Sequence, residues 1–156
     1  YDPSPNDRRY RSPYAKFMYD GQWAVDENYG THWDPGVGAK APWIIVDLEK
    51  EHKVSRTQTL FEFTNRTYKY KIDYLPASAA KTLDGAAASA AWRTFADKTA
   101  SGAPQSPVTD TPSGGKAVKA RFVRLTITDA DVPPTADGCD DANARNGWSV
   151  FEFRVF

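Results

Sequence analysis

The seven residues from Tyr68 to Tyr74 alternate strictly between large apolar or aromatic side chains and polar ones. This period of two predicts a half-buried β-strand with its large side chains on one face. The other apolar stretches are also short and bounded by turn residues; they cover residues 43–48, 54–63, 92–96, 120–128 and 148–156. Many short strands at turn-marked spacing predict an all-β protein, either an antiparallel β-sandwich or a jelly roll.

Helix-forming sequence is scarce in this chain. The Ala-rich stretch 77–91 is interrupted by Asp84-Gly85, and we expect an irregular excursion there with at most one helical turn. Residues 101–115 and 129–147 are rich in Pro, Gly and polar side chains and predict loops. The 156 residues suit one domain, and the single cysteine, Cys139, excludes an internal disulfide.

The charges of the chain balance, with 20 Lys and Arg against 20 Asp and Glu. A net charge of zero gives no global field that would attract nucleic acid or an anionic membrane, so we expect no nucleic-acid partner. No apolar run approaches the length of a transmembrane helix, since Trp43–Val46 is about the best available.

The first residues of the chain are polar and spaced by prolines, which is typical of a linker. We therefore expect a linker or N-terminal extension over residues 1–14 and a single domain over residues 15–156. The chain begins abruptly and ends inside a strand-like segment. We expect it to be a module of a longer protein.

Hard oxygen donors gather in the loop that contains Asp26, Asn28 and Thr31, where Gly30 lets the chain turn. Such donors are what Ca²⁺ prefers. Glu152 adds a carboxylate in an otherwise apolar last strand, where a cation would compensate its burial. One hypothesis is a metal shared by this loop and Glu152. The alternative is a loop in which Asp26 and Asn28 only make turn hydrogen bonds to backbone amides.

Several segments together resemble the discoidin, or coagulation factor 5/8 type C, domain. They are Ala24–Asp26, Thr31–Trp33, Pro42–Leu48, Tyr70–Leu75, Asp84-Gly85 with Trp92, Ala120–Leu125 and Ser149–Phe153. The resemblance is closest to the family-32 carbohydrate-binding modules of bacterial glycan-degrading enzymes, and it implies a galactose-binding-like jelly roll. The chain departs from the family where Glu27 follows Asp26 in place of Gly. A second departure is the long spacing between Ser78, Asp84 and Trp92.

The resemblance also implies a ligand set for a structural calcium ion. Side-chain ligands would be Asp26, Asn28, Thr31 and Glu152, and backbone carbonyls would come from Trp23, Thr31 and Phe151. Two carboxylates would balance the divalent charge, and about seven oxygens match the coordination that Ca²⁺ prefers. An EF-hand is excluded, because the acidic residues required at its later positions are missing.

The sequence has none of the nucleophile, zinc-protease or phosphate-loop motifs that mark common enzyme classes. His32 lies in the metal loop and His52 in a charged turn, and neither accompanies a nucleophile motif. A pair of carboxylates for glycoside hydrolysis stays possible in principle, because any two acids can meet in space. We nevertheless expect a non-catalytic binding module.

Sugar-binding modules combine an aromatic face with charged or amide groups. By resemblance to family-32 modules, we expect ligand contacts from the loops at one end of the sandwich, at Asp34, Asn65, Arg66, Asn146 and Trp148. A His is common in the family at the first of these positions, so Asp34 is a departure. The alternative roles are core packing for Trp148 and a solvated loop charge for Arg66.

These expectations combine into one functional hypothesis. We expect a carbohydrate-binding module with a structural calcium ion, covalently linked to a catalytic or surface domain such as a glycoside hydrolase. We expect the parent protein to be extracellular or on the cell surface, as a secreted bacterial protein. The alternatives are a discoidin-type domain that binds protein or phospholipid, and a spacer that packs on a neighbouring catalytic domain.

Overall fold

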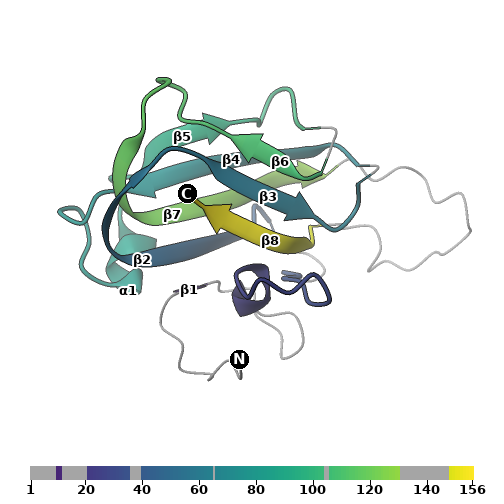
Figure 1. Cartoon of the computed structure of the whole chain (residues 1–156), viewed down its shortest axis with the longest axis horizontal. Helices are drawn as coiled ribbons and strands as arrows, with labels where there is room; N and C mark the ends of the chain where they lie inside the picture. Colours follow the sequence, from purple (N-terminus) through teal and green to yellow (C-terminus); the bar gives the residue numbers. More distant parts are fainter. Residues whose placement is uncertain (1–9, 12–20, 36–39, 65, 104–105, 131–147) are drawn as a thin grey trace, which may run out of the picture.

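A computed structural model describes residues 10–11, 21–35, 40–64, 66–103, 106–130 and 148–156. These residues form two antiparallel β-sheets that pack on each other (Figure 1), with strand orders β1-β2-β7-β4-β5 and β6-β3-β8. The strands are β1 (Tyr10–Arg11), β2 (Trp43–Val54), β3 (Thr57–Phe61), β4 (Tyr68–Leu75), β5 (Arg93–Asp97), β6 (Val108–Asp110), β7 (Val118–Ala130) and β8 (Val150–Val155). The predicted all-β sandwich is confirmed.

Strand β7 is the centre of the larger sheet, because it pairs with β2 on one side and with β4 on the other. The alternation predicted for β4 is confirmed. Tyr68, Tyr70 and Ile72 are buried between the sheets, and Tyr74 packs partly buried against the same cluster. Alternate residues of a strand point to opposite faces, so this pattern fixes which face of the larger sheet meets the smaller sheet.

The main core fills the space between the two sheets. Phe61 from β3 stacks on Tyr68 from β4, with ring centroids 3.9 Å apart and an interplanar angle of 10°. Trp33, Phe95 and Leu125 are fully buried in the same cluster. Each large side chain buried here contributes roughly 1.5–3 kcal/mol, so aromatic residues supply much of the driving force for sheet packing.

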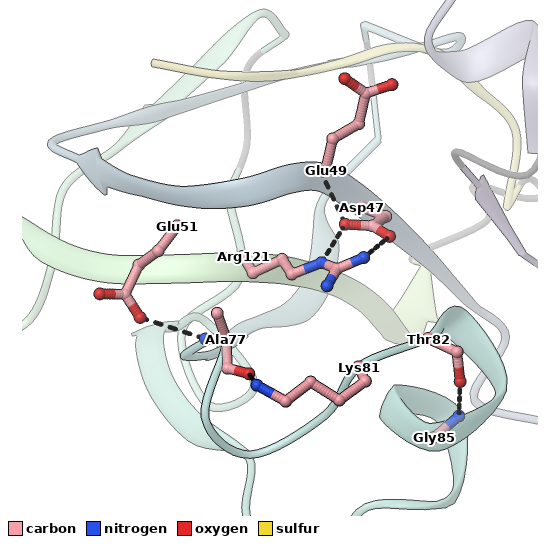
Figure 2. Close-up of polar contacts among 8 residues, drawn as sticks. All are labelled: Asp47, Glu49, Glu51, Ala77, Lys81, Thr82, Gly85 and Arg121. Atoms are coloured by element: carbon pink, nitrogen blue, oxygen red, sulfur yellow. Dashed lines mark hydrogen bonds and ion pairs between the residues drawn. The ribbon is translucent and has the colours of Figure 1, made fainter.

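A smaller core covers the outer face of the larger sheet. Ile45, Leu75 and Phe122 project from β2, β4 and β7 and pack under helix α1 (Leu83–Ala88). Thr82 caps this helix, because its hydroxyl oxygen accepts a hydrogen bond from the Gly85 N–H at 3.1 Å (Figure 2). The stretch expected to be an irregular excursion therefore contains a short capped helix.

Ion pairs flank this smaller core. Arg121 binds Asp47 through two N–H donors, Nε to Oδ1 at 2.9 Å and a terminal nitrogen to Oδ2 at 3.0 Å (Figure 2). Asp73 is 2% exposed, and it is compensated by Arg124 at 2.9 Å and Lys71 at 3.0 Å. Paired in this way, the charges avoid the cost of lone buried ions.

The two residues of β1 join the edge of the larger sheet, where Tyr10 pairs with Val46 and Arg11 with Ile45. They fall within the stretch for which the sequence predicts a linker, and the predicted domain boundary itself stays a prediction. A 3₁₀ helix, η1 (Gly21–Ala24), precedes the loop that carries Asp26 and lies against β8 (Figure 1).

We expect the substitution Tyr70→Phe to destabilise the fold. The Tyr70 hydroxyl donates to Asp110 Oδ2 at 2.6 Å inside the core, and burial together with this carboxylate raises the pKa of Tyr70. Losing this donor leaves a buried carboxylate unsatisfied, which lowers the free energy of unfolding by about 1–3 kcal/mol in urea denaturation.

Tyr74→Phe is the matched control, because the half-buried Tyr74 hydroxyl makes no hydrogen bond to any described residue. Equal losses of stability in the two variants would contradict a specific role for the Tyr70–Asp110 hydrogen bond.

Candidate functional site

The loop from residue 25 to residue 33 is built by short-range hydrogen bonds from polar side chains. Asp26 Oδ1 accepts the Asn28 N–H at 3.0 Å, and Asn28 Oδ1 accepts the Gly30 N–H at 2.9 Å. Glu27 adopts a φ of 60°, in the left-handed region that favours the Gly found there in the family. The turn hydrogen bonds offered as the alternative interpretation are therefore present.

Thr31 brings three oxygens together inside this loop. Its hydroxyl lies 2.7 Å from Asp26 Oδ2 and 2.9 Å from the Asn28 carbonyl oxygen. A hydroxyl has one proton, so it can donate to only one of these acceptors at a time. One of these two oxygens therefore always lacks the hydroxyl proton and is available to another donor or to a cation.

The loop is fastened to the last strand at Trp33. Trp33 N donates to the Val150 carbonyl at 2.8 Å, and Val150 N donates to the Trp33 carbonyl at 2.9 Å. The Trp33 side chain is fully buried in the main core. Because Glu152 lies two residues beyond Val150 on β8, this bridge brings its carboxylate to the loop that carries Asp26.

Glu152 is a buried carboxylate, with 1% of the residue exposed. Its Oε2 accepts from Arg154 Nε at 3.4 Å, and its Oε1 has no hydrogen-bond partner among the described residues. Burial, and secondly the negative charge of Asp26, raise the pKa of Glu152, although Arg154 and the Asn28 N–H oppose that shift. The site therefore holds more negative charge than the described protein groups compensate.

The predicted carbonyl ligands belong to elements that touch each other. Trp23 lies in η1 and Phe151 in β8, and η1 packs against β8. No group of three or more His, Cys, Asp or Glu side chains forms a metal site among the described residues. The donor set here is instead two carboxylates with amide, hydroxyl and carbonyl oxygens, which suits a hard cation such as Ca²⁺ better than zinc.

Arg154 is a residue of this region that the sequence reasoning missed. One of its terminal nitrogens donates to the Tyr29 hydroxyl at 2.8 Å, and its guanidinium carbon lies 5.3 Å from the centre of the Tyr29 ring. Tyr29 is 56% exposed, so this contact extends over the outside of the loop. Strand alternation is the signal that could have found Arg154, because residues two apart share a face.

Of the predicted sugar-binding residues, Asp34, Arg66 and Trp148 are described, and they lie near the start of β8 and the start of β4. Asp34 follows Trp33, so the antiparallel Trp33–Val150 pairing places it beside Ser149. The carbonyl of Ser149 accepts the Glu62 N–H at 3.1 Å. Trp148 is half-buried and packs against the main core. Backbone pairing thus places the backbone segments at Asp34 and at Glu62 on opposite sides of the start of β8.

Arg66 is more enclosed than a solvated loop charge, with 8% of the residue exposed. Its guanidinium carbon lies 3.8 Å from the centre of the Phe63 ring, and the backbone N–H of Arg66 donates to the Phe63 carbonyl at 3.4 Å. Such stacking fixes the direction of the side chain. The other two predicted contacts, Asn65 and Asn146, lie outside the described residues.

Sequence comparison identifies the family of this chain. The pattern of the F5/8 type C domain matches residues 11–140, which is most of the chain. The chain belongs to the F5/8 type C domain family. No curated protein sequence matches it significantly.

Solved structures share the fold of this F5/8 type C domain at low sequence identity. Chitosan-binding module 1 of a chitosanase/glucanase from Paenibacillus sp. IK-5 is 20% identical, with a TM-score of 0.70 over 96% of this chain and 94% of that one. Module 2 of the same enzyme, in complex with chitotriose, is 24% identical, with a TM-score of 0.70 over 96% and 95%. The Clostridium perfringens module CpGH89CBM32-6 is 15% identical, with a TM-score of 0.66 over 97% and 95%.

The F5/8 type C domain also matches part of a much larger protein, described as a glycoside hydrolase. The identity is 20% and the TM-score 0.58, over 88% of this chain and 24% of that one. Within the described part of the domain, no helix has the length and apolar character needed to cross a membrane.

In the metal-free F5/8 type C domain, we expect Glu152→Gln to raise stability at neutral pH. The pKa of Glu152 is raised, so the folded state disfavours its charged form, and stability falls as pH rises from the ordinary carboxyl value through the raised one. The neutral amide removes this loss. The advantage of the variant should shrink as pH falls and vanish once the carboxyl is protonated in both states.

Urea denaturation in the presence of a chelator, at several pH values, measures this difference. Glu27→Gln serves as the control, because it neutralises an exposed carboxylate of the same loop. A Glu152→Gln variant that is less stable by the same amount at every pH would contradict the expectation.

Proposed function

We propose that this F5/8 type C domain is a non-catalytic carbohydrate-binding module whose fold is stabilised by a calcium ion. One observation carries the proposal. Three carbohydrate-binding modules from two organisms each superpose on at least 96% of this chain. The family membership adds support, and so does the lack of catalytic motifs in the sequence. Partial alignment with a glycoside hydrolase supports a parent protein with a linked catalytic domain. A secreted or surface-bound location for that parent protein is part of the proposal.

The proposed sugar site is the end of the sandwich around Asp34, Arg66 and Trp148, with Asn65 and Asn146 completing it. The Trp148 ring would stack on the apolar face of a sugar ring. The Asp34 carboxylate would accept hydrogen bonds from sugar hydroxyls or from the ammonium group of a glucosamine unit, and Arg66 would donate to ring or hydroxyl oxygens. Because one of the superposed modules binds chitotriose, chito-oligosaccharides are the first ligands to test.

The proposed calcium site comprises the oxygens of Asp26, Asn28, Thr31 and Glu152, with the carbonyls of Trp23, Thr31 and Phe151. The orphaned Oε1 of Glu152 and the electrostatic repulsion between Glu152 and Asp26 support a cation there. The ion would supply positive charge and crosslink the loop to β8. No open coordination position is needed for this role, which is structural.

We expect Trp148→Ala to weaken sugar binding about tenfold, which corresponds to about 1.4 kcal/mol, because a stacking surface is lost. Affinity electrophoresis against chitosan and isothermal titration with chitotriose measure the effect. The matched control is Phe156→Ala, which removes an aromatic side chain that follows β8 and is 45% exposed.

Melting temperatures of both variants separate loss of binding from loss of fold. If the unmodified domain binds no sugar on a glycan array at millimolar ligand but binds phospholipid vesicles or a protein partner, the carbohydrate proposal is wrong. If it binds nothing, the role of a spacer packed on a catalytic domain is favoured.

We expect calcium to raise the stability of the domain, by about 2.7 kcal/mol at a free concentration one hundred times the Kd. A melting curve with Ca²⁺ and with EDTA measures this shift. Asp26→Asn and Glu152→Gln should each remove most of the response, because each deletes a charged ligand. Glu27→Gln, in the same loop, should keep it. An unchanged midpoint on adding EDTA to the unmodified domain would rule out the proposed site.

A further inference from the structure

A basic hollow lies at the other end of the sandwich. At this end β4 finishes and β5 and β7 begin, on the left in Figure 1. It is open and has a volume of about 570 Å³, within the roughly 300–1,000 Å³ range of ligand clefts. Arg93, Lys116 and Lys119 supply its positive charges, and Tyr74, Pro76 and Ser78 form part of its wall. Pairing of Tyr74 with Arg93 holds two sides of the hollow on neighbouring strands.

These cations lack the carboxylates that accompany most other cations of this sheet. Lys71, Arg121 and Arg124 each pair with an Asp on the outer face. By contrast, none of the three cations of the hollow forms an ion pair with any described residue. The side chains of all three are exposed. They are therefore free to bind an external anion.

The strand register adds a further like charge beside the hollow. Lys53 of β2 lies directly opposite Lys119 of β7. Residues paired in this way have Cβ atoms about 4.5–5.5 Å apart, and like charges at such positions destabilise a sheet. An anion bound beside Lys119 would relieve this repulsion.

The carboxylate of Glu51 also lines the hollow, and a hydrogen bond to the backbone fixes its position. Glu51 Oε2 accepts the Ala77 N–H at 3.1 Å, and the Ala77 carbonyl accepts from Lys81 Nζ at 3.0 Å (Figure 2). This contact ties β2 to the segment that follows β4. With three cations and one carboxylate, the lining residues carry a net charge of +2 (3 − 1).

We infer that this hollow is a second binding surface, for an acidic polysaccharide that bears carboxylate or sulfate groups. The exposed cations would bind the acidic groups of such a chain, and Tyr74 and Ser78 present hydroxyls to its sugar rings. An open hollow suits an extended polymer better than an enclosed small molecule. The choice of a polysaccharide over other polyanions rests on the proposed carbohydrate-binding function.

The hollow is distinct from the proposed sugar site. The segment from Tyr68 to Leu75 separates the two ends of β4 by roughly 23 Å, at about 3.3 Å per residue. Arg66 precedes one end of this strand, and Pro76 follows the other. Substitutions at the hollow should therefore leave chitotriose binding unchanged, which allows the two proposals to fail separately.

The test is affinity electrophoresis of the whole chain against polygalacturonate, with fully methyl-esterified polygalacturonate as the neutral polymer of the same backbone. We expect retention by the acidic polymer alone, and retention that falls with added salt. The double variant Arg93→Gln/Lys119→Gln should bind polygalacturonate about tenfold more weakly. Both positions are exposed, so melting temperatures should hardly change.

The matched control is Lys40→Gln/Lys98→Gln, which removes the same charge at the opposite end of the sandwich and should bind almost as well as the unmodified chain. Equal losses in the two double variants, or no retention of the unmodified chain at low salt, would overturn the inference. So would a single-stranded oligonucleotide that binds through the hollow while polygalacturonate does not. Polygalacturonate binding without any chitotriose binding would refute only the proposed sugar site around Asp34, Arg66 and Trp148.

Discussion

The pair of hydrogen bonds between Trp33 and Val150 determines how the two ends of the described domain meet. It is only one bridge, but the fully buried Trp33 side chain fixes it in the main core. The bridge sets the register of the polar loop against β8. Three features depend on that register: Asp26 lies near Glu152, Arg154 reaches Tyr29, and Asp34 lies beside the start of β8.

The same register creates an electrostatic cost that the described protein groups do not fully offset. Glu152 is buried on β8 with one unsatisfied oxygen, and the nearby charge of Asp26 opposes its ionisation. Its contact with Arg154 is long, at 3.4 Å, and the Arg154 guanidinium also donates to Tyr29. Protonation or a bound cation would relieve this cost, and Asp26, Asn28 and Thr31 supply the oxygens that favour the cation.

The sequence predicts the parts of this fold in which one face is buried and the chain is regular. The alternation in β4 and the strand expected over residues 120–128, which lies within β7, are of this kind. Other features depend on contacts between distant segments. Strand β2 continues to Val54 through a register shift after Asp47. Strand β6 lies in a Pro- and Gly-rich stretch, and it forms because its backbone pairs with Thr57–Thr59 of β3. Helix α1 is short, but Phe122 and Trp92 give it a surface to cover.

The distribution of charge over the folded surface likewise cannot be predicted from the sequence alone. A net charge of zero correctly describes the whole chain, yet the fold separates its charges. Carboxylates of Asp26 and Glu152, 126 residues apart in sequence (152 − 26), meet at one site. Arg93 and Lys116–Lys119 come together at another only because β5 and β7 begin at the same end of the larger sheet. Electrostatic attraction falls off over about 10 Å in dilute salt, so a ligand responds to these local surfaces and not to the total. Neutral composition therefore excludes a global field without excluding a charged ligand.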